Sequence, residues 1–156
     1  MNHPITLLNH QNRAVAQQIR DVQIVSYRVE AKWIQFDHIP YLKESINHIQ
    51  NCSEVFIGCM KESTLAGVLS FEIQNHILCI HRLVVHPTYF RKGIGQSLLA
   101  YVCEQEALHY EVQTGTRNTP AIRLYQSMGF HITGEKTVAK DLKMSLLRRE
   151  GGKNMC

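Results

Sequence analysis

The sequence predicts an α/β fold in which a mixed, mostly antiparallel central sheet is flanked by helices. Three observations support this prediction. Apolar residues recur at helical spacing in the first fifty residues, they recur at strand spacing between short turns in the middle of the chain, and a glycine-rich loop followed by a further helical pattern interrupts the strands near residue 93. Short turns between strand-period segments favour an antiparallel meander.

Length and composition limit the classes of protein. The chain has 156 residues, of which 44% are hydrophobic and 19% charged, as expected of one globular domain over 1–156. Its five cysteines include no Cys-x-x-Cys pair, which argues against a disulfide framework and a zinc site and predicts a reducing, cytoplasmic location. The net charge of +4 suits an anionic ligand but falls short of a dense nucleic-acid-binding face. Nucleic acid is therefore not an expected partner. A membrane is not expected either, because no apolar run is long enough to span a bilayer.

The first fifty residues are expected to form one short strand and two helices. Residues 5–8 are typical of a strand. Apolar residues from Val15 onward fall on one helical stripe, which predicts a helix with a break before Trp33. Residues 36–40 are typical of a loop, and 41–49 of a second helix.

The middle of the chain changes to the period of two that is typical of strands. Val55, Ile57 and Cys59 alternate with the other residues of 54–60, and a turn follows at 61–63. A second strand is predicted over 65–73, a second turn at 74–76 and a third strand over 77–85.

The last third is expected to alternate helices and strands. The predicted order is a helix from residue 94, a strand over 108–114, a short helix from 119 to 129, and closing strands over 132–138 and 142–147. Thr119 can cap the short helix, Pro120 suits its first turn and Gly129 can end it. Residues 148–156, which include Arg148 and Arg149, are expected to be a frayed tail.

The most informative segment is Leu-Val-Val-His-Pro-Thr-Tyr-Phe-Arg-Lys-Gly-Ile-Gly-Gln-Ser over residues 83–97. An apolar run ends at a proline, a basic pair follows, and the glycines precede an amphipathic stretch. Unbonded backbone N–H groups at a helix N-terminus form an anion site, and Arg91 and Lys92 add positive charge beside it. The segment therefore predicts a phosphorylated cofactor. It is not a dinucleotide fingerprint, because Leu98 stands where the third glycine would be.

Two segments together resemble the GNAT superfamily, the acetyl-CoA-dependent N-acetyltransferases. Residues 84–99 are similar to the coenzyme-binding loop and helix of that family. Residues 118–130, Asn-Thr-Pro-Ala-Ile-Arg-Leu-Tyr-Gln-Ser-Met-Gly-Phe, are similar to its Asn-x-x-Ala…Tyr…Gly-Phe segment. The resemblance covers roughly 53–147 and leaves 1–50 for acceptor-side helices. Where the family usually has Arg or Gln, this chain has Phe90, with an arginine next to it.

The resemblance implies acetyl-CoA as co-substrate, no metal, and a splayed central strand pair. It implies that the coenzyme is held by residues of the third strand, the glycine loop and the short helix: Leu83, Val84, Val85, Arg91, Lys92, Gly93, Ile94, Gly95, Gln96, Ser97, Asn118, Ala121 and Tyr125. In the family, backbone groups corresponding to residues 83–85 bind the pantetheine amides, and one N–H there is a candidate donor to the thioester oxygen.

Acetyl transfer to an amine sets the roles of the candidate catalytic residues. An amine with an ordinary pKa of ~10.4 must lose a proton, which costs about 4.6 kcal/mol at pH 7. His81 stands where many relatives carry a glutamate and is the first candidate for the base, since histidine titrates near neutrality. Glu72 and Glu30 are rivals for that role and candidates for binding the acceptor. Tyr125 is the candidate that stabilises or protonates the leaving thiolate. For Tyr125 and His81 the alternative is a purely structural side chain.

The expected function is transfer of an acetyl group from acetyl-CoA to a primary amine of a small molecule, by direct attack in a ternary complex. Two alternatives stay open. One is a protein lysine or N-terminal acetyltransferase, and the other is a non-catalytic acyl-CoA-binding or sensor domain. The acceptor, the use of other acyl groups and the oligomeric state are left open, with a homodimer as one option.

Overall fold

The computed structural model describes residues 3–34 and 40–151. Its elements in chain order are β1 (Thr6–Leu8), α1 (Arg13–Ile34), the 3₁₀ helix η1 (Pro40–Lys43), α2 (Ile46–Asn51), β2 (Val55–Lys61), β3 (Thr64–Gln74), β4 (Ile77–Val85), the 3₁₀ helix η2 (Pro87–Tyr89), α3 (Ile94–Cys103), β5 (His109–Gly115), α4 (Thr119–Ser127), β6 (His131–Ala139) and β7 (Leu142–Glu150). The predicted strands and the helices α1, α3 and α4 are all present. The differences are local and are described below.

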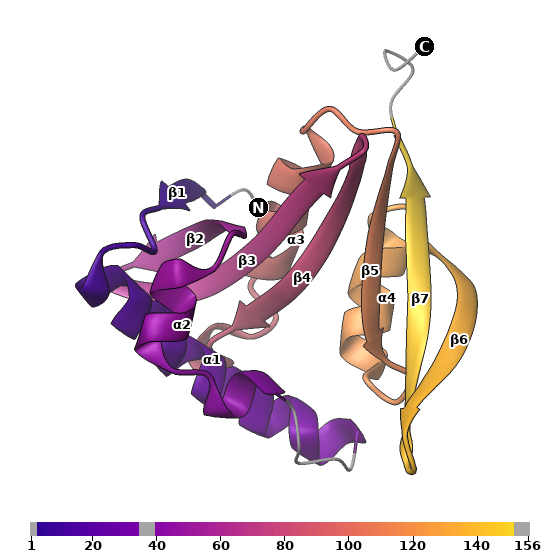
Figure 1. Cartoon of the computed structure of the whole chain (residues 1–156), viewed down its shortest axis with the longest axis horizontal. Helices are drawn as coiled ribbons and strands as arrows, with labels where there is room; N and C mark the ends of the chain where they lie inside the picture. Colours follow the sequence, from indigo (N-terminus) through magenta and orange to yellow (C-terminus); the bar gives the residue numbers. More distant parts are fainter. Residues whose placement is uncertain (1–2, 35–39, 152–156) are drawn as a thin grey trace.

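Seven strands of the described chain form one sheet in the order β1-β2-β3-β4-β5-β7-β6 (Figure 1). Neighbouring strands are antiparallel except β4 and β5, which run parallel. The prediction of a mixed, mostly antiparallel sheet is therefore confirmed. None of the helices in the described residues is long and apolar enough to cross a membrane.

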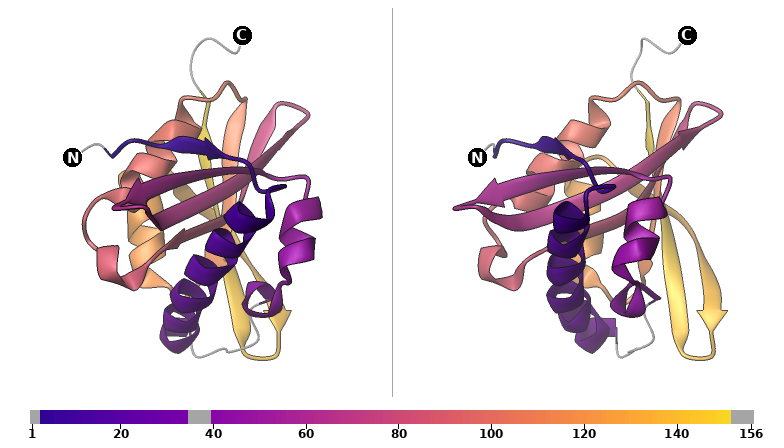
Figure 2. Two further views of the ribbon diagram at one scale, coloured as in Figure 1. Left: turned by 90° about the vertical axis from the view of Figure 1, so that its left-hand side faces the viewer. Right: turned by 60° about the vertical axis from the view of Figure 1, so that its left-hand side comes forward.

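The two faces of the sheet carry separate cores. In β2 and β3, Ile57 and Leu69 pack in the core beneath α3 and α4, whereas their neighbours Phe56 and Val68 pack in the core beneath α1 and α2. Adjacent strand residues point to opposite faces, so this alternation places the helix pairs on opposite sides of the sheet. Figures 1 and 2 show the same arrangement.

The parallel strands β4 and β5 part after four residue pairs. Their pairing runs from Ile77 opposite His109 to Ile80 opposite Val112. Beyond these pairs β4 continues beside β3, and β5 continues beside β7. The sheet therefore opens as a V (Figure 1), which confirms the splayed central pair.

A β-bulge lies where the V begins. On β4, Ile80 is opposite Phe71 and Arg82 is opposite Ser70, so His81 is an extra residue. An extra residue reverses the face to which the following side chains point. Ile80 accordingly packs in the α3–α4 core, whereas Arg82 and the residues beyond it alternate in the opposite phase.

The N-terminal helices differ from the prediction in two ways. Helix α1 continues through Trp33, so the predicted break before Trp33 is wrong. Trp33 continues the helix but does not continue its buried face. Its side chain is 41% exposed, and its ring lies beside that of Phe90 instead of in the core. The helix predicted over 41–49 is divided, because Ser45 adopts an extended conformation and its hydroxyl caps the N–H of His48. Of the loop predicted over 36–40, residues 36–39 lie outside the described residues.

The cap of α4 is one residue earlier than predicted. Asn118, rather than Thr119, is the N-cap, and its Oδ1 accepts a hydrogen bond from the N–H of Ala121 at 3.3 Å. The end predicted at Gly129 is confirmed, because this residue adopts the left-handed conformation (φ 89°) that favours glycine.

Strand β7 extends into the segment predicted to be a frayed tail. Arg148 is opposite Glu111 of β5 and His131 of β6, and Arg149 is opposite Tyr110 of β5. These arginines belong to a regular strand because β7 lies between β5 and β6 and pairs with both. Lys153 lies outside the described residues.

Candidate active site

A cleft of about 730 Å³ opens where β4 and β5 part. The strands contribute Ile80, His81, Arg82, Leu83, Val85, Val112, Gln113, Thr114 and Gly115. The glycine loop and α4 form the wall on one face of the sheet, and α1 with η1 forms the wall on the other. The V in the sheet therefore connects the two faces.

The glycine loop ends at the start of α3, as predicted. Gly93 is the N-cap and adopts the left-handed conformation (φ 83°, ψ 8°), which only glycine enters without strain. Its carbonyl accepts the N–H of Ser97 at 3.0 Å, so the earlier N–H groups of this first turn have no acceptor within the helix. Such a helix N-terminus is suited to phosphate oxygens.

Gly95 serves helix packing. A Cβ at this position would lie 2.8 Å from Cδ2 of Leu124 on α4, so the absence of a side chain allows α3 and α4 to approach closely. The spacing of the two glycines in the sequence does not distinguish this role from a direct approach of phosphate to the backbone.

Ten of the thirteen predicted coenzyme residues line the cleft. The three outside its lining are Val84, Lys92 and Ser97. Val84 faces the α1–α2 core, the amine of Lys92 lies 5.6 Å from the centre of the Tyr89 ring, and the hydroxyl of Ser97 accepts the backbone N–H of His3 at 3.0 Å. These contacts hold the loop and α3 in place.

Tyr125 lies on α4 with its side chain almost wholly buried at the edge of the cleft. Its ring packs edge-on against Phe130, with the centroids 5.5 Å apart. Burial, reinforced by the charge of Glu30, raises the pKa of Tyr125 well above its ordinary value. The hydroxyl therefore keeps its proton and is suited to donate a hydrogen bond to a thiolate. Complete proton transfer to a thiolate with a pKa of ~8.5 is disfavoured.

Glu30 of α1 reaches the same part of the cleft as Tyr125. Nδ2 of Asn118 donates a hydrogen bond to its Oε1 at 2.7 Å, so Asn118 both caps α4 and connects α4 to α1. Burial raises the pKa of Glu30, and the hydrogen bond from Asn118 offsets this effect only in part. A partly desolvated carboxylate in a cleft is a candidate for binding or deprotonating an amine.

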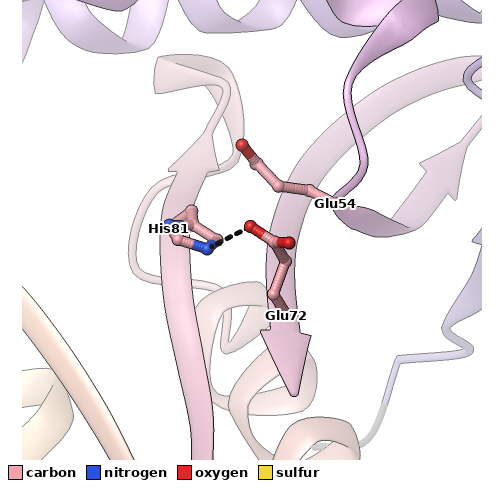
Figure 3. Close-up of side chains that lie close together, drawn as sticks. All are labelled: Glu54, Glu72 and His81. Carbon is pink, nitrogen blue, oxygen red and sulfur yellow. Dashed lines mark ion pairs between the residues drawn. The ribbon is translucent and has the colours of Figure 1, made fainter. Parts of the chain in front are cut away.

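His81 lines the cleft from the bulge of β4, and Glu72 of β3 lies behind it. Nε2 of His81 is 2.9 Å from Oε1 of Glu72 (Figure 3). Glu72 is outside the lining of the cleft, and its Oε2 accepts the hydroxyl of Ser53 at 3.1 Å. If Nε2 donates to Glu72, Nδ1 is left as the acceptor. The structure thus brings these two predicted residues together and gives Glu72 the position of an orienting group.

Glu54 joins His81 and Glu72 to make a cluster whose potential metal-ligand atoms lie within 4.8 Å of one another (Figure 3). Glu54 is already engaged, because its Oε1 lies 2.9 Å from Nη2 of Arg82 and accepts the hydroxyl of Ser70. Partial burial alone would raise the pKa of Glu54, but the Ser70 hydrogen bond and the Arg82 charge outweigh it and lower the pKa. A cation would compete with the guanidinium, so these residues fit an ion-pair network better than a metal site.

Arg82 is the centre of a buried cluster that the sequence did not predict. Its side chain is fully buried, and Nη1 donates to Oε1 of Gln23 and Oε1 of Glu44, both at 2.6 Å. Glu44 is only 8% exposed. The available signal was an arginine inside the apolar run of a central strand, because such a charge needs buried partners.

The Arg82 cluster also holds the wall of the cleft that α1 and η1 form. The guanidinium carbon of Arg82 lies 4.3 Å from the centre of the Tyr41 ring, and the Tyr41 hydroxyl is 3.5 Å from the backbone carbonyl oxygen of His81. Tyr41 in turn stacks on Tyr27, with ring centroids 5.5 Å apart. These contacts hold η1 against β4 and α1.

The sequence and the structure are similar to those of known acetyltransferases. The model of the acetyltransferase (GNAT) family matches residues 16–130. The chain is 42% identical to UPF0157 protein YqkA of Bacillus subtilis (strain 168) over 144 residues, which are 91% of this chain and 42% of that protein. It is 42% identical to Peptidyl-lysine N-acetyltransferase YiaC of Escherichia coli (strain K12) over 50 residues, which are 32% of this chain and 34% of that protein.

A solved structure has the same fold. The PaiA N-acetyltransferase of Thermoplasma acidophilum, in complex with coenzyme A, superposes with a TM-score of 0.73 at 19% identity, over 96% of this chain and 99% of that one. The chain spans less than half the length of the curated relatives that it matches.

Proposed function

The chain belongs to the acetyltransferase (GNAT) family, and from this membership we propose that it transfers the acetyl group of acetyl-CoA to a primary amine of a small molecule. The observation that carries the proposal is the cleft itself. It connects the helix N-terminus at Gly93 on one face of the sheet with the carboxylate of Glu30 on the other, and the hydroxyl-bearing ring of Tyr125 borders it.

The residues of the glycine-loop side fit a coenzyme A moiety. The N-terminus of α3 and the exposed Arg91 suit its phosphates. In the described chain, β4 has no strand partner on its β5 side beyond Ile80, so the backbone of Leu83 and Val85 is placed to bond the amides of an extended pantetheine arm. The bound co-substrate supplies an activated thioester.

The residues of the acceptor side and of α4 have distinct proposed roles. Glu30 binds the acceptor as an ammonium group by charge. His81, oriented by Glu72, accepts the proton that the ammonium releases, so that the neutral amine attacks the thioester carbonyl. A backbone N–H of β4, at Leu83 or Val85, donates to the carbonyl oxygen, and the Tyr125 hydroxyl donates to the departing thiolate.

An acceptor screen tests this proposal. Calorimetry first measures binding of acetyl-CoA, and free thiol is then followed with a panel of primary amines. Amine-dependent thiol release is the expected result. Binding of acetyl-CoA without turnover on any acceptor would favour the alternative of a coenzyme sensor, and no binding at millimolar acetyl-CoA would overturn the proposal.

A second candidate function is acetylation of a protein lysine. It is favoured by the 42% identity over 50 residues to Peptidyl-lysine N-acetyltransferase YiaC. Lysine-containing peptides in the same screen, with product identified by mass spectrometry, distinguish this function from acetylation of a free small molecule.

A further inference from the structure

The acceptor side of the cleft is formed by one face of α1 and by η1. Tyr27, Glu30 and Trp33 are three residues apart in turn, so they share a face of the helix. Tyr41 of η1 stacks on Tyr27 and completes this wall. A carboxylate therefore lies between aromatic side chains.

Among the cleft-lining residues that the structure describes, Glu30 is the only one with a carboxylate. Three further acidic residues contact cleft-lining side chains without lining the cleft themselves. Glu44 and Glu54 are bound by the buried guanidinium of Arg82, and Glu72 is paired with His81. A multiply charged acceptor would need several free carboxylates, whereas this site offers negative charge to a single ammonium group.

The aromatic side chains offer apolar surface next to that charge. Trp33 is 41% exposed, and its ring lies 5.9 Å from the ring of Phe90, which closes the wall on the side of the glycine loop. One face of Tyr41 is covered by Arg82 at 4.3 Å. Aromatic rings attract an ammonium group and bury methylene groups beside it.

From these contacts we propose, building on the function proposed above, that the acceptor is a singly charged alkylammonium: one amine at the end of an apolar stem, rather than a polyamine or an aminosugar. The ammonium group meets Glu30, and the stem lies along Trp33 and the half-buried Tyr41, with the buried Tyr27 stacked behind Tyr41. A free alkylamine and a lysine side chain share this chemistry.

A series of straight-chain amines tests the proposal at constant charge. Thiol release from acetyl-CoA is measured with n-propylamine, n-butylamine, n-pentylamine and n-hexylamine. We expect kcat/KM to rise about three- to fourfold per added methylene until the stem outgrows the wall. Spermidine, compared at equal concentration, should be a poorer acceptor than n-hexylamine. A blocked lysine peptide, compared with n-pentylamine, separates the two sources of the same chemistry.

Variants of Trp33 and Glu30 test the roles of these two side chains. Trp33→Ala should flatten the dependence on chain length without changing the affinity for acetyl-CoA, and Trp33→Phe should restore part of it. Ile132→Ala is the matched control, because Ile132 is similarly exposed, at 46%, but lies on β6 outside the cleft. Glu30→Gln should lower kcat/KM for every amine of the series by about 10- to 100-fold, the effect of losing a charged hydrogen-bond partner.

The outcomes separate this proposal from the acetyl-transfer function on which it rests. A flat series, a preference for spermidine or an aminoglycoside, or an unchanged series in Trp33→Ala would overturn the alkylammonium assignment and leave acetyl transfer standing. Loss of acetyl-CoA affinity in Trp33→Ala would place this side chain at the coenzyme and also overturn the assignment. Binding of acetyl-CoA with no thiol release on any amine would remove both proposals.

Discussion

Two groups of buried or half-buried polar side chains border the cleft, and they are satisfied in opposite ways. In the first, the guanidinium of Arg82 is enclosed by Gln23, Glu44 and Glu54, and its charge is balanced at distances of 2.6–2.9 Å. In the second, Glu30 has no cationic partner among the described residues, and burial raises the pKa of both Glu30 and Tyr125. The carboxylates of the first group have a cationic partner, and the carboxylate of the second has none among the described residues.

From this difference we propose that the first group serves structure and the second serves chemistry. A paired buried charge resists removal of one partner, because the other would be left uncompensated. A buried carboxylate without a cationic partner is unfavourable for the folded state, and such groups cluster where a ligand supplies the missing partner. We therefore expect changes in the Arg82 cluster to alter stability first, and changes at Tyr125 and Glu30 to alter turnover first.

Tyr125→Phe should have the largest effect on rate. It removes one hydroxyl from the second group and keeps the packed ring, so turnover should fall by about 10²- to 10⁴-fold while acetyl-CoA affinity changes little. Steady-state kinetics with a verified acceptor and calorimetry with acetyl-CoA provide the two measurements. Undiminished turnover, with chemistry shown to be rate-limiting, would end the role assigned to Tyr125.

Arg82→Met should have the largest effect on stability. It leaves Glu44 and Glu54 buried without their cation, which costs about 3–5 kcal/mol in the free energy of unfolding. Urea titration measures the loss. The double variant Arg82→Met with Glu44→Gln should recover part of it, because one of the two orphaned charges is gone. A loss below about 1 kcal/mol would show that the Arg82 cluster does not have the structural role assigned to it.

His81→Gln tests whether the His81–Glu72 pair serves catalysis or stability. If His81 accepts the amine proton, turnover should fall by about 10²-fold and the acidic limb of the pH–rate profile should disappear. Glu72→Gln should reduce the rate less and shift that limb instead of removing it. An unchanged profile in His81→Gln would transfer the role of base to Glu30 or to water.

Besides its effect on turnover, Glu30→Gln should have the smallest effect on stability, and that effect should be a gain. Because burial raises the pKa of Glu30 in the folded state, its stabilising contribution is present in the protonated form at low pH and is lost as the pH rises through that pKa. At pH 7 the variant should therefore melt higher by roughly 2–4 °C, equivalent to about 1 kcal/mol. The gain should shrink as the pH is lowered toward 4.5. Glu135→Gln on exposed β6 is the control, and an equal gain there would contradict the explanation.

Local patterns predicted much of the fold and of the coenzyme side of the site. Alternation identified β2 to β4, and the glycine loop and the segment 118–130 correctly placed α3 and α4 around the cleft. These features were visible because their determinants are neighbours in the chain. The divided helix around Ser45 was missed because its apolar spacing continues across the cap.

The acceptor side could not be read in the same way. Arg82 is separated from Gln23, Glu44 and Glu54 by 59, 38 and 28 residues, so no local pattern connects them. The orientation of Arg82 also depends on the bulge at His81, which reverses the side-chain phase of β4 without a glycine or proline to mark it. The exposure of Trp33 was missed because its position continues the apolar stripe of α1, although its side chain is 41% exposed and lines the cleft.

The four-pair ladder between β4 and β5 also has a mechanical consequence. It is the only stretch of backbone pairing that joins the half-sheet β1–β4 to the half-sheet β5–β7 in the described chain. A coenzyme arm bonded along β4 and packed against α4 would act as a second seam across the V. Occupancy should therefore slow amide hydrogen exchange along residues 81–85 and 113–115 together. Under a pulling force the loaded protein should hold its two half-sheets together at loads that separate the empty one.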